Sequence, residues 1–167
     1  MTSPLNKPQD AHILIVDDDA ISRTILRTIL KREGYQVHVV SCGCDALKKA
    51  EKVNPDLVML DIMMPEMDGF ETLKGLKLCL NTADIPVIFV SAKAENDEIV
   101  EGFRLGIVDY VSKPYIPEIL LARVKVHVAL QQINRNLQER ELALEQKTEL
   151  VDLLHRAAVS ANMADDV

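Results

Sequence analysis

Acidic side chains follow two short apolar runs of the sequence, at the point where each run ends. Three consecutive aspartates, Asp17 to Asp19, follow the run 12–16, and Asp61 follows the run 57–60. Carboxylates brought this close together repel one another, so such a cluster is typically neutralised by a divalent cation. Ligand sets made of oxygen alone favour Mg²⁺ or Mn²⁺ over Zn²⁺. Mg²⁺ held in this way also binds phosphate oxygens, which indicates phosphoryl chemistry.

Two further polar residues end later apolar runs. Ser91 follows the run 85–90, and Lys113 comes shortly after the run 107–111. Opposite the metal, these side chains would supply a hydroxyl donor and a cation to a phosphoryl group. Asp61 is placed as a nucleophile that forms an acyl phosphate. Each residue alone is more typical of a solvated surface or a helix N-cap, and only their joint spacing favours a shared site.

Five short apolar runs alternate with helix-period segments, a pattern that predicts an α/β fold with a parallel sheet covered on both faces. The strands are expected at 12–16, 35–40, 57–60, 85–90 and 107–111, with helices after each. Right-handed crossovers place all the carboxyl ends of such strands on one edge of the sheet, where ligands bind. The polar residues at the strand ends are therefore expected to converge.

The last third of the chain has a different pattern. Apolar residues recur at 4–3 spacing, and Arg140 and Lys147 interrupt the stripe: Val126, Leu130, Ile133, Leu137, Leu144, Val151 and Leu154. The pattern predicts one helix from Pro117 to about His155 that forms a coiled coil and makes the protein a homodimer. The expected organisation is a flexible leader at 1–11, a globular domain at 12–125, a coiled coil at 126–156 and a weakly ordered tail or truncated linker at 157–167.

Composition excludes several classes of function. The 167 residues carry 19 Lys and Arg against 26 Asp and Glu, a net charge of −7, which disfavours direct binding of nucleic acid or an anionic membrane. No apolar run approaches the length of a membrane span, and the first ten residues contain no apolar signal segment. The odd number of cysteines, three, fits reduced thiols and a cytoplasmic location. We interpret Cys42 and Cys44 as packing residues rather than a metal or redox pair.

Four segments together carry a family resemblance: Ile13–Asp19, Leu60–Gly69, Val90–Ala92 and Asp109–Pro114. They resemble the receiver domains of response regulators in two-component signalling, in unbroken order over about residues 11 to 125. The resemblance implies a flavodoxin-like, doubly wound sheet of five parallel strands in the order 2-1-3-4-5. It also implies a phosphorylation-dependent switch that receives its phosphoryl group from a sensor histidine kinase or a phosphotransfer protein.

The same resemblance implies roles for single residues. Asp61 would accept the phosphoryl group, and Lys113 would contact the acyl phosphate. Asp18 and Asp61 would bind Mg²⁺ directly, together with the main-chain carbonyl of Met63, while Asp17 would act mainly through water. Ser91 would move toward the phosphoryl group.

Tyr110 would rotate inward behind Ser91 during the switch. Met63 and Lys93 would flank the path of the attacking water, so apolar Met63 is expected to prolong the phosphorylated state. Ile107-Val108 replaces the small residue usual after Gly106, which should affect packing rather than chemistry.

Two alternatives remain open from the sequence. Asp17 and Asp19 also resemble the nucleophile and the acid/base of haloacid-dehalogenase-type phosphohydrolases, although Ala20 stands where that family has Thr or Val and Asp61 is left unexplained. The chain could otherwise be a constitutive coiled-coil dimerisation module. A separate output enzyme is not expected from these residues, which form either a fragment of a longer protein or a protein that acts through its coiled coil.

Overall fold

The structure is a computed structural model that describes residues 10–92 and 95–164, with side chains to residue 161 at the carboxyl-terminal end. Most of the expected leader, residues 1–9, lies outside the described residues. The sheet contains five parallel strands: β1 (His12–Val16), β2 (Gln36–Val40), β3 (Leu57–Asp61), β4 (Val87–Ser91) and β5 (Asp109–Ser112). Their order is β2-β1-β3-β4-β5, which confirms the predicted doubly wound fold.

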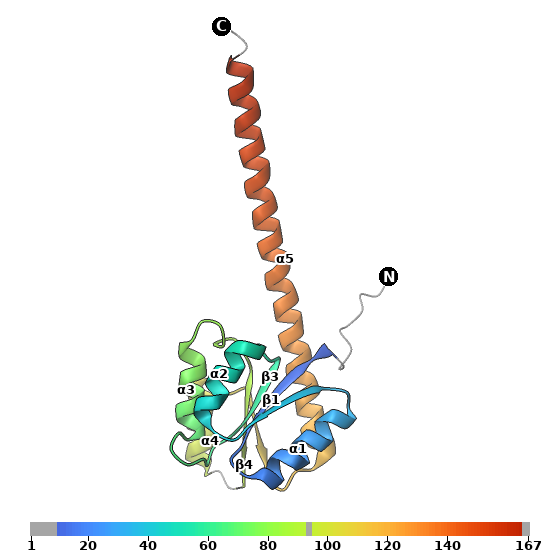
Figure 1. Ribbon diagram of the computed structural model, residues 1–167, viewed down its shortest axis with the longest axis vertical. Coiled ribbons are helices and arrows are strands. Elements are labelled where there is room, and N and C mark those ends of the chain that lie inside the picture. The colour runs from blue at the N-terminus through green and yellow to red at the C-terminus, as the bar shows by residue number, and fades with distance from the viewer. Residues whose placement is uncertain (1–9, 93–94, 165–167) are drawn as a thin grey trace. The chain divides into compact units, whose positions relative to one another are not determined.

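Helices cover both faces of this sheet. They are α1 (Ala20–Arg32), α2 (Gly43–Val53), α3 (Gly69–Leu78), α4 (Asn96–Leu105) and α5 (Pro117–Ala164). The sheet lies between α1 and the start of α5 on one side and α2 and α3 on the other (Figure 1). Side chains that alternate along the central strands separate into two apolar cores. One core joins the sheet to α1 and α5 through residues such as Ile15 and Leu120, and the other joins it to α2 and α3 through Leu14 and Leu73. This two-sided burial explains why the strands are almost wholly apolar.

The core on the α2 and α3 face is aliphatic apart from a few aromatic rings. Phe89 is fully buried, and Phe70 packs its ring edge against it at a centroid distance of 5.2 Å. Ile107 is also buried, and a Cβ atom on Gly102 would lie 2.8 Å from its Cδ1 atom. Ile107 therefore fills the space beside Gly102, which agrees with the expectation that its size affects packing.

Four of the five strands differ from the predicted ranges, β2 and β3 by one residue at one end. β4 begins at Val87 because the preceding Ile85 N–H is used in a turn, where it donates to the Thr82 carbonyl. β5 begins at Asp109 because the Ile107 N–H donates to the carbonyl of Gly102 at the end of α4. α3 ends at Leu78, so Leu80 lies beyond the helix and is 94% exposed.

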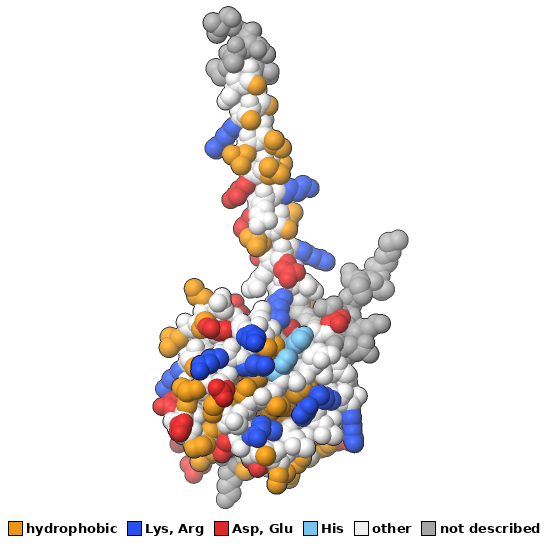
Figure 2. All heavy atoms as spheres, in the orientation of Figure 1, with side chains coloured by type: hydrophobic (Ala, Val, Ile, Leu, Met, Phe, Trp, Pro, Cys, Tyr) orange, Lys and Arg blue, Asp and Glu red, His pale blue; other side chains and the backbone are white. Residues whose placement is uncertain are grey.

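The last helix, α5, is longer than predicted. It continues past His155 to Ala164, through residues for which the sequence predicts a weakly ordered tail, and 165–167 lie outside the described residues. The chain divides into two units between Gln131 and Gln132. In the second unit the apolar stripe is exposed and alternates with charged side chains (Figure 2), with Leu144 64% exposed. None of the helices in the described ranges is long and apolar enough to cross a membrane.

Candidate functional site

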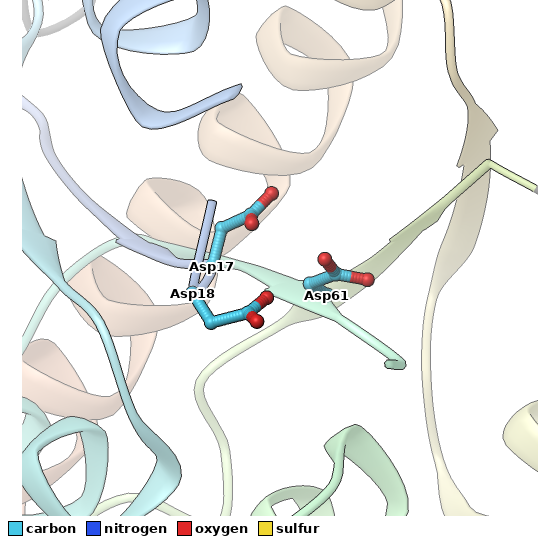
Figure 3. A group of neighbouring side chains, drawn as sticks. All are labelled: Asp17, Asp18 and Asp61. Atoms are coloured by element: carbon cyan, nitrogen blue, oxygen red, sulfur yellow. The ribbon is translucent and has the colours of Figure 1, made fainter. Parts of the chain in front are cut away.

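The carboxyl edge of the sheet brings together the acidic residues that the sequence singles out. Asp17 and Asp18 follow β1, and Asp61 is the last residue of β3 (Figure 3). Oxygen atoms of these three carboxylates lie within 4.8 Å of one another. Asp17 and Asp61 are buried, with 1% and 6% exposure, whereas Asp18 is exposed to solvent. Such a cluster carries strong mutual repulsion unless cations compensate it.

The turn between β1 and α1 is fixed by hydrogen bonds. The Asp19 N–H donates to Oδ1 of Asp17 at 2.8 Å, while the Asp19 carboxylate caps α1 by accepting from the Ser22 N–H at 3.0 Å. Nη1 of Arg23 donates to the carbonyls of Asp17 at 2.7 Å and Asp18 at 2.9 Å. Asp19 is therefore a capping residue outside the acidic cluster. Sequence reasoning missed Arg23, which holds the backbone of both acids.

The loop after β3 is shaped by a glycine that approaches the backbone of Asp61. The Gly69 N–H donates to the Ile62 carbonyl at 2.9 Å, and a Cβ on Gly69 would lie 2.5 Å from the Asp61 carbonyl oxygen. No other residue type fits this approach without a backbone shift. The Met63 N–H donates to Oδ1 of Asp61 at 3.1 Å, and the Met63 side chain is 69% exposed. The loop thereby orients the Asp61 carboxylate.

Lys113 joins the two buried carboxylates. Its Nζ lies 2.7 Å from Oδ2 of Asp17 and 3.2 Å from Oδ2 of Asp61. Burial lowers the pKa of Lys113, but the hydrogen bond to Asp17 and the neighbouring negative charges outweigh burial, so the pKa of this ammonium lies above the ordinary range of a lysine. Burial and the Asp17 charge raise the pKa of Asp61, and the Met63 N–H and Lys113 oppose that rise. One ammonium against three carboxylates leaves the cluster with excess negative charge.

The excess charge and the donor chemistry fit a hard divalent cation. Asp17, Asp18 and Asp61 offer oxygen donors only, the set preferred by Mg²⁺ and Mn²⁺. Within residues 10–92 and 95–161, no other group of three His, Cys, Asp or Glu side chains lies close enough to hold a metal ion. The described cysteines are free thiols, and the Sγ of Cys79 contacts Glu51.

A cavity of about 380 Å³ opens beside this cluster. Its lining residues are Asp61, Met63, Ser91, Ala92, Glu95, Glu98 and Lys113. An Asp61 carboxylate in contact with such a cavity can reach an incoming phosphorus atom, and the Lys113 ammonium can neutralise charge there. Lys93, expected beside the path of the attacking water, lies outside the described residues. Glu95 and Glu98 did not appear among the residues predicted for the site, because neither follows a strand.

The two residues expected to switch lie next to each other. Ser91 ends β4 and is 1% exposed, and the half-buried Tyr110 on β5 donates from its hydroxyl to the Ser91 carbonyl at 3.4 Å. The Tyr110 carbonyl accepts from Arg123 of α5 at 2.9 Å, and the same guanidinium pairs with Asp109. His127 also contacts Asp109, at 3.2 Å. β5 is therefore tied to the first turns of α5, a link that sequence spacing did not indicate.

Tyr115 is a further residue near the site that sequence reasoning missed. Its hydroxyl is buried and has no hydrogen-bond partner among the described residues. Burial raises the pKa of Tyr115 to about 12; the Lys113 ammonium and the Ser22 side chain oppose this rise, while the charges of Asp17 and Asp61 add to it. The one sequence feature that could have indicated Tyr115 as a site residue is its position two residues after Lys113.

Comparison with known proteins gives one consistent family. The family model for the response regulator receiver domain matches residues 13–125. The alkaline phosphatase synthesis transcriptional regulatory protein PhoP of Bacillus subtilis is 43% identical over 113 residues, which cover 68% of this chain and 46% of that protein. The DNA-binding response regulator MtrA of Mycobacterium tuberculosis is 35% identical over 116 residues, covering 70% and 50%. The chain spans about half the length of the curated relatives it matches.

Solved structures agree with this result. The chemotaxis protein CheY4 of Vibrio cholerae superposes with a TM-score of 0.66 at 30% identity, covering 69% of this chain and 96% of that one. The receiver domain of the sensor histidine kinase PA1611 of Pseudomonas aeruginosa matches with a TM-score of 0.66 at 25% identity, covering 71% and 97%. That relative holds a magnesium ion coordinated in its active site cleft.

Proposed function

Because the chain belongs to the response-regulator receiver family and is thus a phosphorylation-dependent signalling switch, we propose that Asp61 accepts the phosphoryl group. One observation carries this assignment. Asp61 is the carboxylate that contacts Lys113 at 3.2 Å, belongs to the acidic cluster and also lines the cavity. Asp17 contacts Lys113 as well but is absent from that lining. The phosphohydrolase alternative is not favoured, since Asp19 is occupied in capping α1.

A Mg²⁺ ion, or Mn²⁺ in its place, is the expected cofactor. Asp18 and Asp61 would hold it directly together with the Met63 main-chain carbonyl, and Asp17 would act through water. The clustered carboxylates and the magnesium-bound relative PA1611 support this assignment. When bound, the cation would supply positive charge that offsets the charge of the carboxylates and of the phosphoryl oxygens.

The chain's own residues perform the transfer. An Oδ atom of Asp61 attacks phosphorus, a P–O bond to Asp61 forms as the donor's P–N bond breaks, and the donor imidazole leaves. Lys113, shared by Asp17 and Asp61, turns toward the phosphoryl oxygens and neutralises them. Ser91 donates its hydroxyl to one of these oxygens. The donor is a sensor histidine kinase or a phosphotransfer protein.

The change at Asp61 is transmitted through Ser91 and Tyr110 to α5. Movement of Ser91 displaces Tyr110, whose hydroxyl contacts the Ser91 carbonyl and whose own carbonyl accepts from Arg123. Because Arg123 belongs to α5, a shift of β5 alters the start of the helix that carries the apolar stripe. The proposed output is a changed pairing of α5 in a homodimer, supported by the exposed 4–3 stripe.

The remaining partners stay predictions. Relatives such as MtrA are DNA-binding regulators, and this chain spans half their length, so the absence of nucleic-acid binding by the whole protein is untested. The predicted separation from membranes and the cytoplasmic location likewise stay predictions.

Mass spectrometry after incubation with a phosphorylated histidine phosphotransfer protein and Mg²⁺ tests the assignment. We expect the label on Asp61, its loss in Asp61→Asn, and its retention in the matched control Asp152→Asn on α5. A label on Asp17 would support a hydrolase-type nucleophile and overturn the proposal. Scattering with and without beryllofluoride tests the output, since an identical mass and shape would refute a dimer rearrangement.

A further inference from the structure

The cavity beside Asp61 has an acidic wall, made of Glu95 and Glu98. Both residues line it together with Asp61 and Lys113, so its described lining has three carboxylates against one ammonium. Glu95 immediately precedes α4, and its N–H donates to Oε2 of Glu98 at 3.1 Å. This hydrogen bond fixes Glu98 at the start of the helix, next to the cavity.

The acidic wall lies close enough to influence an incoming phosphoryl group. A cavity of about 380 Å³ is only about as wide as the Debye length at physiological ionic strength, roughly 8 Å. A phosphorus atom within reach of Asp61 therefore experiences the Glu95 and Glu98 charges with incomplete screening. Glu95 is exposed and Glu98 half-buried, so their effect is modest and depends on salt.

We infer that the acidic wall selects among phosphodonors by charge, and disfavours small dianionic donors relative to donors that carry less negative charge. The inference rests on the proposed function, because it concerns phosphoryl transfer to Asp61. A phosphohistidine on a partner protein delivers its phosphoryl group on an imidazole that can be protonated, and its docking surface adds binding energy. Acetyl phosphate has neither advantage and approaches the wall as a dianion.

Two small donors separate charge from geometry, because both transfer the same group. With acetyl phosphate, a P–O bond to Asp61 forms as the donor's P–O bond breaks, and acetate leaves with the electron pair. With phosphoramidate, the P–N bond breaks and ammonia leaves. At neutral pH the first donor carries two negative charges and the second carries one. A purely electrostatic effect must therefore change the logarithm of the first rate twice as much as that of the second.

The variants Glu95→Gln and Glu98→Gln remove charge while preserving size, and glutamine at position 98 can keep the capping hydrogen bond. At low ionic strength and saturating Mg²⁺, each is expected to speed phosphorylation by acetyl phosphate about fourfold and by phosphoramidate about twofold, for charges about 8 Å apart. In high salt, both ratios of the variant's rate to that of the unaltered protein should fall toward one. Glu101→Gln, on α4 but outside the cavity lining, is the matched control.

Intact-mass spectrometry at early times measures both rates. A larger gain with acetyl phosphate that disappears in high salt supports the inference. Equal factors for both donors, no change, or the same gain in Glu101→Gln would overturn it. Failure of the proposed function is distinguishable, because then neither donor labels Asp61 in the unaltered protein.

Discussion

Replacement of Asp61 by asparagine should stabilise the protein when Mg²⁺ is absent. The Asp61 carboxylate lies within 4.8 Å of two like-charged groups and 3.2 Å from one ammonium. At an effective dielectric constant of about 20, each repulsion is worth about 3.5 kcal/mol and the attraction about 5 kcal/mol. The net cost of the charge is then about 2 kcal/mol. Asp61→Asn, which keeps an oxygen for the Met63 N–H, should recover an amount of this order.

The pH dependence follows from the raised pKa of Asp61. Between its unfolded and folded pKa values, the folded state binds more protons than the unfolded state, so this group lowers stability as pH rises through that window. The full penalty is present above the folded pKa and vanishes below the unfolded one. The advantage of Asp61→Asn should therefore be largest near neutral pH and should disappear in acid.

Thermal unfolding in chelator measures the effect. A gain of about 2 kcal/mol corresponds to a rise in Tm of about 4–8 °C for a chain of this size. Adding Mg²⁺ to 100 times its Kd should stabilise the unaltered protein by about 2.7 kcal/mol, and should stabilise Asp61→Asn by much less. Asp152→Asn, an exposed change of the same type, should move Tm little. A less stable Asp61→Asn without Mg²⁺, or an equal response to Mg²⁺, would refute this electrostatic account.

Four other outcomes are expected. Tyr115→Phe should stabilise the protein by about 1 kcal/mol in denaturant titration, because it removes a buried hydroxyl that lacks a partner; a loss would reveal a hidden hydrogen bond. Gly102→Ala should destabilise by about 1–3 kcal/mol, because the new Cβ would meet both Ile107 and the Phe89 ring, and Ile107→Val, which relieves one of these two contacts, should reduce that cost in a double-mutant cycle. Burial and the neighbouring His12 lower the pKa of His38, so the free energy of unfolding should fall as pH drops below about 6.5, where the unfolded chain binds a proton at this position more readily than the folded protein does. His38→Gln should weaken this dependence of the unfolding free energy on pH, whose slope stays well below the one-proton limit of about 1.4 kcal/mol per pH unit. Met63→Asn should shorten the phosphorylated lifetime several-fold in a phosphate-release assay, and an unchanged lifetime would count against the role of this exposed side chain.

Much of the fold could be predicted because its signals are local. Apolar runs such as 12–16 and 57–60 must be buried on both faces, and the alternation with helical segments leaves few arrangements other than a parallel sheet. The boundaries were less predictable. β5 begins two residues later than its apolar run because Ile107 completes the end of α4, a choice made by backbone hydrogen bonds.

The sequence by itself determined which groups meet at the site, because Asp17, Asp61 and Lys113 lie at or just after the carboxyl ends of strands that share one edge. Only the tertiary structure decided how they share charge. The position of one ammonium 2.7 Å and 3.2 Å from two buried carboxylates depends on the packing of β1, β3 and β5. Residues that reach the site from helices, Arg23 and Glu98, were likewise beyond prediction. Their contacts depend on how a helix is rotated and placed against the sheet, which spacing along the chain does not specify.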